Sequence, residues 1–207
     1  YNPEKVHFGM LRVLNDDIVA PGKGFGMHPH DNMEIITIPL SGSLEHKDNM
    51  GNGAVIRSGD VQLMSAGTGV FHSEFNPSKN EAVSLFQIWI FPKLKNVKPR
   101  YDQKSFDVKD RINKLQTLVQ PGPTDKGLWI YQDAWLSMGK FDEGLKSEYI
   151  INRKGNGAYV MVVTGSFEID GHTLRKRDAI GISNTDKFSF TSKEEGSELL
   201  VIEVPMN

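Results

Sequence analysis

A short motif occurs twice in this chain, and that repetition limits what the chain can fold into. Residues 42–45, Gly-Ser-Leu-Glu, return as residues 165–168, Gly-Ser-Phe-Glu, and residues 56–61 return more weakly as residues 174–179. Both copies lie among short apolar segments separated by Gly, Asn and Asp, a pattern typical of all-β sandwiches and barrels. The sequence therefore predicts two copies of one antiparallel β-barrel domain.

A polar stretch separates the two copies. Residues 93–105 show no hydrophobic period and contain Pro99, as expected for a connection between domains. We expect an N-terminal domain over residues 1–98, a connector with one helical turn over 99–114, and a C-terminal domain over 115–207. Because the chain begins with tyrosine rather than methionine, we also expect the natural protein to extend further at its N-terminus.

The composition excludes several classes of function. With 24 basic and 26 acidic residues the net charge is −2, and no run of Lys and Arg is long enough to follow a nucleic-acid backbone. The absence of cysteine excludes disulfides and thiolate chemistry, so nitrogen and oxygen atoms must hold any metal ion. No apolar run approaches the roughly 20 residues that a membrane-spanning helix needs. We therefore expect a cytoplasmic protein that binds neither nucleic acid nor membrane.

Two short polar pairs in the N-terminal half carry ligand chemistry. Residues 28–30 read His-Pro-His, and residues 72–74 read His-Ser-Glu. Because alternate residues of a strand point to the same face, each pair directs two side chains one way. If the two strands are neighbours, three imidazoles and one carboxylate can converge on a single ion and leave coordination positions open for catalysis.

A structural role for these histidines is the alternative. A single histidine in a strand is more often a hydrogen-bonded core or surface residue than a ligand, and we assign His7, His46 and His172 to that class. The pairs differ, because three of the six histidines lie in them and apolar strands are expected nearby at 35–40 and 83–91. An unpaired polar group buried there would cost about 1–3 kcal/mol. The pattern therefore favours a metal site.

The second copy of the repeat lacks these ligands. When the two copies are aligned on their shared glycines, the four positions of the polar pairs fall on side chains that do not form such a site. These positions are Ile151, Arg153, Phe190 and Ser192. Because His172 is the only histidine of that half, we expect a metal ion in the N-terminal domain alone.

Several motifs occur in a fixed order along the chain. They are residues 24–30, Gly42 with 44–48, 59–62, Ala66-Gly67 leading to 72–74, 99–101 and 132–134. Together they span essentially the whole chain and resemble the pirin family of the cupin superfamily. The resemblance is specific, because it rests on several motifs rather than one.

The resemblance implies a fold, a ligand set and an activity. The implied fold is a bicupin, with two antiparallel β-barrel (jelly-roll) domains packed face to face and a metal only in the first. The implied metal ligands are His28, His30, His72 and Glu74. Family members are associated with quercetin 2,3-dioxygenase activity, and a eukaryotic pirin acts as an iron-dependent nuclear co-regulator. Family members also usually carry more sequence before the point at which this chain begins.

A second carboxylate leaves the roles of the acids open. Glu34 follows His30 by four residues, so it shares the face of His30 if the strand is unbroken. In many other cupins a glutamate near this position is the metal ligand. We favour Glu74 as the ligand and as the base that removes a substrate proton. Glu34 is then a second candidate base beside the site, or a residue that a bulge displaces from it.

We expect a mononuclear metal-dependent dioxygenase that cleaves a flavonol such as quercetin with O2. Three imidazoles and a carboxylate suit Fe(II), and Ni(II), Cu(II), Mn(II) and Zn(II) are alternatives, because such donors select poorly among metals. Seven apolar side chains could form a wall for a flat aromatic substrate. They are Phe25, Met27, Ile36, Phe71, Phe75, Phe86 and Trp89. The alternatives are a metal- or redox-sensing regulator that acts through a protein partner, and a non-redox isomerase or lyase.

Overall fold

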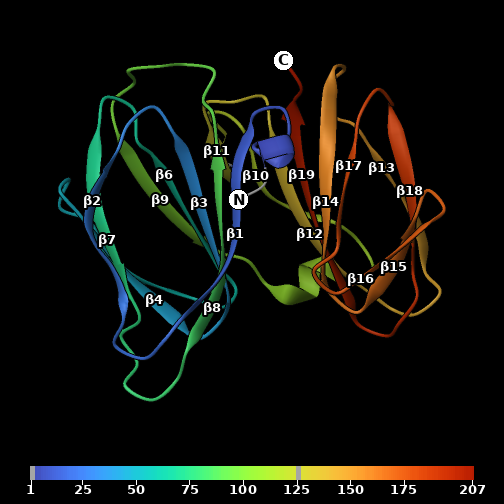
Figure 1. Cartoon of the computed structure of the whole chain (residues 1–207), viewed down its shortest axis with the longest axis horizontal. Coiled ribbons are helices and arrows are strands. Elements are labelled where there is room, and N and C mark those ends of the chain that lie inside the picture. Colours follow the sequence, from blue (N-terminus) through green and yellow to red (C-terminus); the bar gives the residue numbers. More distant parts are fainter. Residues whose placement is uncertain (1–2, 125–126) are drawn as a thin grey trace. The chain divides into compact units, whose positions relative to one another are not determined.

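The computed structural model describes residues 3–124 and 127–207, and nearly all of its regular elements are β-strands (Figure 1). The expectation about the start of the chain at Tyr1 lies outside the described residues. The chain divides into two compact units. We call residues 11–106 with 122–132 the N-terminal unit, and residues 1–10, 107–121 and 133–207 the C-terminal unit.

The N-terminal unit contains two antiparallel sheets. One sheet has the strand order β1-β8-β3-β6-β9 and the other has the order β2-β7-β4-β5. The strands are β1 (Leu11–Val19), β2 (Gly24–His30), β3 (Glu34–Ser41), β4 (Ser43–Asp48), β5 (Gly53–Arg57), β6 (Asp60–Ser65), β7 (Val70–Phe75), β8 (Val83–Ile90), β9 (Arg100–Ser105) and β11 (Leu128–Ile130). The two sheets form a barrel that is not strictly closed, because they remain separate hydrogen-bonded ladders.

The C-terminal unit repeats this plan. The strands of this unit follow one another in the order β10-β12-β19-β14-β17 in one sheet and β13-β18-β15-β16 in the other. The elements are the 3-10 helices η1 (Pro3–Lys5) and η2 (Val108–Arg111) and the strands β10 (Gln116–Pro121), β12 (Trp135–Phe141), β13 (Lys146–Ile150), β14 (Asn156–Thr164), β15 (Ser166–Ile169), β16 (His172–Arg175), β17 (Ala179–Ile182), β18 (Lys187–Ser192) and β19 (Ser197–Pro205). The prediction of an all-β chain with two antiparallel domains is confirmed. The described residues form no helix with the length and apolar character that crossing a bilayer requires.

Part of the expected connector, residues 99–114, belongs to a sheet. Residues 100–105 form β9, which pairs antiparallel with β6 along its whole length. The hydrophobic pattern does not reveal this strand, because β9 lies at the sheet edge and carries polar side chains. Gln103, for example, donates hydrogen bonds to Asp60 and to the carbonyl of Val55. The expected helical turn is present as η2, which Asp107 caps at its N-terminus.

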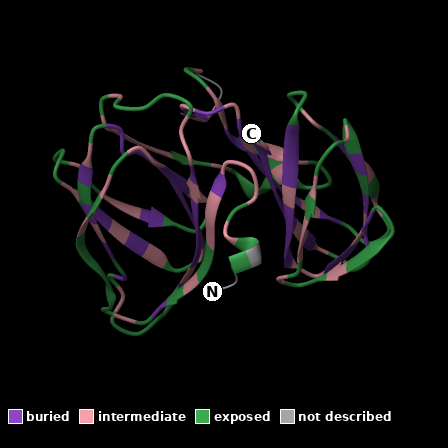
Figure 2. Cartoon of the chain, turned by 45° about the horizontal axis from the view of Figure 1, so that its top comes forward, coloured by how far each residue is buried: buried purple, intermediate pink, exposed green. Residues whose placement is uncertain are grey.

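The two units fill their interiors differently. Buried residues gather on the strands of both units (Figure 2). In the C-terminal unit the core contains a cluster of aromatic rings. The rings are Phe141, Tyr149, Phe167, Phe188 and Phe190. The N-terminal unit contains apolar clusters around Leu44 and around Ile35, and it buries polar side chains beside them. These include Thr37, His46, Gln62, His72 and Glu74.

Strand pairing corrects the expected alignment of the two copies. In the N-terminal unit Glu74 on β7 lies opposite His46 on β4. In the C-terminal unit Phe190 on β18 lies opposite Ile169 on β15. His46 and Ile169 occupy the same place in the repeat, four residues after the shared glycine. Phe190 is therefore the counterpart of Glu74.

The expected counterparts were wrong by two residues. Phe188 rather than Phe190 takes the place of His72, and the cross-strand partner of Phe188 is Tyr149, as the partner of His72 is His28. Counting from the shared glycine failed because the turns that connect the strands differ in length between the two units. The conclusion that this half carries none of the imidazole ligands is unchanged.

Candidate metal centre

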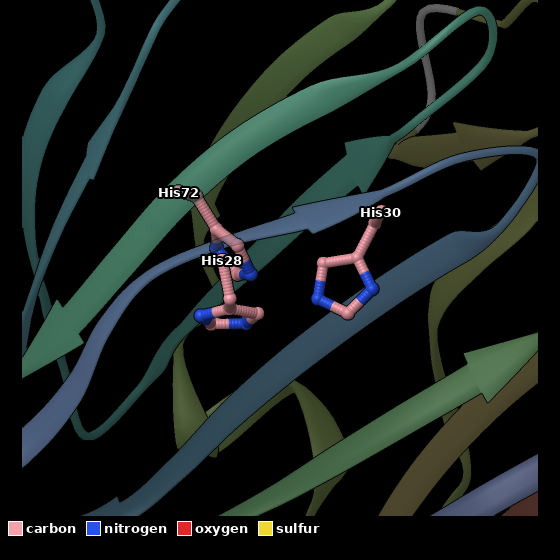
Figure 3. Close-up of side chains that lie close together, drawn as sticks. All are labelled: His28, His30 and His72. Atoms are coloured by element: carbon pink, nitrogen blue, oxygen red, sulfur yellow. The ribbon is translucent and has the colours of Figure 1, made fainter.

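The two polar pairs meet because β2 and β7 are neighbours. His28 on β2 lies opposite His72 on β7 in the antiparallel register. The rings of His28, His30 and His72 face one another (Figure 3), and their centroids are 4.4–5.0 Å apart. One ligand atom of each imidazole lies within 4.8 Å of the other two. Gly24 lets the backbones of β2 and β7 lie close together, because a Cβ atom at that position would collide with the carbonyl oxygen of Glu74.

The free nitrogen atoms of these rings fit a metal ion. Nδ1 of His28 donates to the carbonyl oxygen of Gly26 at 2.7 Å, because a carbonyl can only accept, and this leaves Nε2 unprotonated in the neutral ring. The Nε2 atoms of His30 and His72 are buried and have no hydrogen-bond partner among the described residues. A buried nitrogen without a partner costs stability unless something binds it. Together with Nε2 of His28, these two buried atoms match the donor set of a divalent metal ion.

The charge state of the rings also fits. Burial lowers the pKa of His72 to about 3, and the neighbouring His28 and His30 act in the same direction. Burial likewise lowers the pKa of His30. Both rings are therefore neutral near pH 7, and the neutral imidazole is the form that binds metals.

Glu74 lies next to His72 and is held by hydrogen bonds. Its carboxylate accepts from Gln87 Nε2 at 2.7 Å and from Thr37 Oγ1 at 3.4 Å. Trp89 Nε1 donates to Gln87 Oε1, which fixes the orientation of the amide. Glu74 forms a second group of candidate ligands with His46 and His72, again within 4.8 Å. Burial raises the pKa of this carboxyl, although the hydrogen bond from Gln87 opposes the rise.

Glu34 lies elsewhere. β2 ends at His30 and β3 begins at Glu34, and Asn32 between them has a φ of 44°, so the two residues do not share a strand. Glu34 accepts a hydrogen bond from Ser65 Oγ at 2.7 Å. Thr37, which reaches Glu74, is an odd number of positions away on β3 and therefore points to the opposite face. The structure thus brings Glu74 close to His72 and His46, whereas Glu34 is in neither group of candidate ligands.

His46 was assigned a structural role on sequence grounds, yet it lies against the site. It is fully buried, and its Nδ1 lies 3.5 Å from Nδ1 of His72. Its Nε2 lies 3.2 Å from Oδ2 of Asp48. A signal was present in the sequence, because residues 46–48, His-Lys-Asp, form a third pair of polar side chains on one strand face.

The expected aromatic wall is largely absent from the site. Trp89 packs edge-on against His30 at 4.9 Å between ring centroids. By contrast, Met27, Phe71 and Phe75 alternate with the candidate ligands along β2 and β7 and are exposed on the outward face, between 39% and 59% of their surface. Alternation along a strand explains this, because residues adjacent to the ligands must point away from them.

Comparisons with known proteins agree with the geometry. The sequence model of the Pirin family matches residues 1–90, and the model described as "Quercetinase C-terminal cupin domain" matches residues 117–204. A protein of Escherichia coli K12 named quercetin 2,3-dioxygenase is 37% identical over 207 residues, which cover 99% of this chain and 87% of that protein. A pirin-like protein of Caulobacter vibrioides is 38% identical over 202 residues, covering 97% of this chain and 86% of the relative.

A solved structure shows the same similarity. The crystal structure of the bacterial pirin YhhW from Escherichia coli in complex with nickel(II) has a TM-score of 0.92 and 36% sequence identity, and the match covers 99% of this chain and 86% of that one. Identity at this level over nearly the whole length indicates common descent. The chain therefore belongs to the pirin family of cupin proteins.

Proposed function

We propose that the chain binds one divalent metal ion through His28, His30, His72 and Glu74 and acts as a pirin-type dioxygenase that cleaves a flavonol such as quercetin with O2. The observation that carries the metal site is the convergence of three imidazoles. Nε2 of His30 and of His72 is buried without a partner among the described residues, and His28 uses Nδ1 to bind the carbonyl of Gly26. Four protein ligands on an ion that accepts five or six leave positions for substrate and dioxygen.

The names of relatives support the reaction class. The Escherichia coli relative is named quercetin 2,3-dioxygenase, and the similar YhhW structure contains nickel(II). For this chain we propose Fe(II) as the working metal, with Ni(II), Cu(II), Mn(II) and Zn(II) as alternatives, because nitrogen and oxygen donors discriminate weakly among these ions. The substrates are then a flat aromatic enol and O2.

The residues around the site have separable tasks. The bound metal would supply Lewis-acid activation of the substrate hydroxyl and a site for O2. Glu74 accepts the hydroxyl proton, because its raised pKa makes it a stronger base than an exposed carboxylate. Gln87 and Trp89 hold the Glu74 carboxylate in one orientation through consecutive hydrogen bonds. Trp89 also restricts the movement of His30 by packing against its ring.

Oxygen consumption tests the proposed reaction. The full chain, loaded separately with Fe(II), Ni(II), Cu(II) or Mn(II), is mixed with quercetin in an oxygen-electrode cell, and product is followed by loss of the flavonol absorbance. We expect turnover with at least one metal. Glu74→Gln should lower kcat about 100- to 10,000-fold, the usual contribution of a general base. Glu34→Gln is the matched control and should leave kcat within a few-fold of the parent.

Two outcomes would contradict the proposal. If Glu34→Gln abolishes turnover and Glu74→Gln does not, the carboxylate roles are reversed. If no metal form consumes oxygen with any of several flavonols, the dioxygenase function is wrong and a regulatory role through a protein partner becomes the better explanation.

A further inference from the structure

We propose that Asp48 and His46 are positioning residues that fix the tautomer of His72, so that its Nε2 atom carries the lone pair that a metal ion needs. This inference rests on the proposed metal site, since it assigns a task to residues beside a ligand. Neither Asp48 nor His46 needs to touch the ion. Both belong to β4, which pairs with the ligand strand β7.

The three side chains form a continuous chain of close contacts. Asp48 Oδ2 lies 3.2 Å from His46 Nε2, and His46 Nδ1 lies 3.5 Å from His72 Nδ1. The side chains of Asp48 and His46 are both fully buried, and His72 is also fully buried. Pairing between the strands explains the contacts, because Asp48 lies directly opposite His72 in the β4 and β7 register.

The direction of each hydrogen bond follows from the carboxylate of Asp48, the acceptor at one end of this series of contacts. An ionised carboxylate can only accept, so His46 Nε2 carries a proton and donates it to Asp48. In neutral His46 the Nδ1 atom is then an acceptor, and His72 Nδ1–H donates to it. The remaining nitrogen of His72, Nε2, must be unprotonated. Nε2 of His72 is the buried atom that has no partner among the described residues.

Asp48 and His46 are themselves held in place. Asp48 Oδ1 accepts backbone N–H groups from Met50 at 2.9 Å and from Asn52 at 3.0 Å, and its Oδ2 accepts from Asn52 Nδ2 at 2.8 Å. The hairpin between β4 and β5 therefore prevents the carboxylate from rotating. Tyr101 stacks on the His46 ring, with 4.9 Å between centroids and 27° between planes. A fixed second layer of this kind commonly orients metal-binding histidines.

We call the hydrogen bonds from His72 through His46 to Asp48 the relay. The substitution Asp48→Asn tests the relay with little change in side-chain shape. The two backbone N–H groups need an acceptor at the Oδ1 position, so the new amide must place its oxygen there and its NH2 group at the Oδ2 position. The side-chain amide of Asn52, which donates to Oδ2 in the parent, must turn so that its Oδ1 accepts one N–H of this group. The other N–H donates to His46 Nε2, which forces the proton of neutral His46 onto Nδ1. His46 in turn donates to His72 Nδ1, so the proton of His72 moves to Nε2, the atom meant for the metal.

Two measurements on the 207-residue chain report this change of the His72 tautomer. The ¹⁵N NMR spectrum of the metal-free protein distinguishes Nδ1–H from Nε2–H imidazoles, and isothermal titration with Ni(II) measures metal affinity. We expect His72 to be the Nδ1–H tautomer in the parent and the Nε2–H tautomer in Asp48→Asn. We expect Ni(II) to bind the variant about 10- to 100-fold more weakly, the usual effect of losing a partner behind a metal ligand.

The matched control is Glu45→Gln. Glu45 is also a carboxylate of β4, but it points outward and pairs with Lys47 at 3.1 Å. This variant carries the same change of charge on the same strand and should leave the His72 tautomer and the Ni(II) affinity unchanged. His46→Phe is a second test, because it keeps a ring stacked on Tyr101 and removes the acceptor of His72; it should weaken Ni(II) binding to a similar extent.

Several results would overturn the relay. They are an Nε2–H tautomer for His72 in the parent, an Asp48→Asn variant whose tautomer and Ni(II) affinity match the parent, or an equal loss of affinity in Glu45→Gln. Neither readout requires turnover. A parent that binds Ni(II) and has the expected tautomer but never consumes oxygen would refute the proposed dioxygenase function and leave the relay standing.

Discussion

The two units have corresponding sheets but bury different side chains at one matching place. At the matching points of β7 and β18, the N-terminal unit carries His72 and Glu74, and the C-terminal unit carries Phe188 and Phe190. Phe188 stacks against Tyr149 with 5.3 Å between centroids and belongs to the aromatic core. The strand framework therefore accepts either a polar centre or a ring cluster at the same place.

This difference indicates that the strand arrangement itself does not require polar side chains at these positions. The rings of the C-terminal unit gain stability from apolar burial, at about 25 cal/mol per Å². The N-terminal unit instead buries two imidazole nitrogens without partners, and each such group costs about 1–3 kcal/mol. The unpartnered imidazoles therefore make the N-terminal unit less stable than aromatic rings, such as those of the C-terminal unit, would make it at the same place. Binding of a metal ion would offset that cost.

The largest expected effect is the loss of metal from His72→Ala. Removing one of three converging imidazoles should reduce the metal content to near zero. The exposed His172 belongs to neither candidate ligand group found among the described residues, so His172→Ala should retain one ion per chain. Elemental analysis of both purified variants checks this expectation. An unchanged metal content in His72→Ala, or two ions per chain in the parent, would contradict the proposal that only the N-terminal unit binds a metal ion.

The next effect concerns the aromatic side of the comparison. Phe188→Ala should lower the free energy of unfolding by about 3–5 kcal/mol, because it leaves a cavity in a packed ring cluster. The metal content should not change, since the ligands are in the other unit. Denaturant titration and elemental analysis measure the two quantities. A loss below about 1 kcal/mol would show that the rings do not stabilise the C-terminal unit in the way that this comparison requires.

The smallest effect concerns Glu34, a buried acid away from the histidines. Burial raises the pKa of Glu34 from 4.5 to about 7. Because its pKa is higher in the folded than in the unfolded chain, the linked stability is fully present below pH 4.5 and is lost as the pH rises through about 7. The shift corresponds to about 3 kcal/mol.

Glu34→Gln cannot ionise and should not show this loss. The free energy of unfolding of the variant, relative to the parent, should increase by up to about 3 kcal/mol between pH 4 and pH 9. Urea titrations at several pH values measure the difference, with the outward-facing Glu45→Gln as control. A difference that stays constant over this range would mean that Glu34 titrates as an ordinary exposed acid.

Period-two spacing predicted much of the candidate site. His28, His30, His72 and Glu74 could be singled out because each pair lies on one strand face, and the structure does bring β2 and β7 together. Whether Glu34 lies beside these ligands depends on the interruption of the strand at Asn32, where φ is positive. The spacing of residues in the sequence does not reveal such a local φ value.

Other features depended on pairing between distant strands. The counterpart of His72 in the second copy could not be placed to the residue, because turn lengths shift the register. His46 escaped notice because its importance comes from lying against His72 across two strands. The edge strand β9 was hidden because its polar residues carry no hydrophobic alternation.

Anomalous diffraction from crystals of the nickel-loaded chain tests the central claim most directly. We predict one anomalous peak per chain, about 2.0–2.2 Å from the Nε2 atoms of His28, His30 and His72 and from a carboxylate oxygen of Glu74. Residues 133–207 should show no peak. A main peak away from these four side chains, or a second peak of equal height in the C-terminal unit, would contradict the proposal that only one of the two barrels is a metal centre.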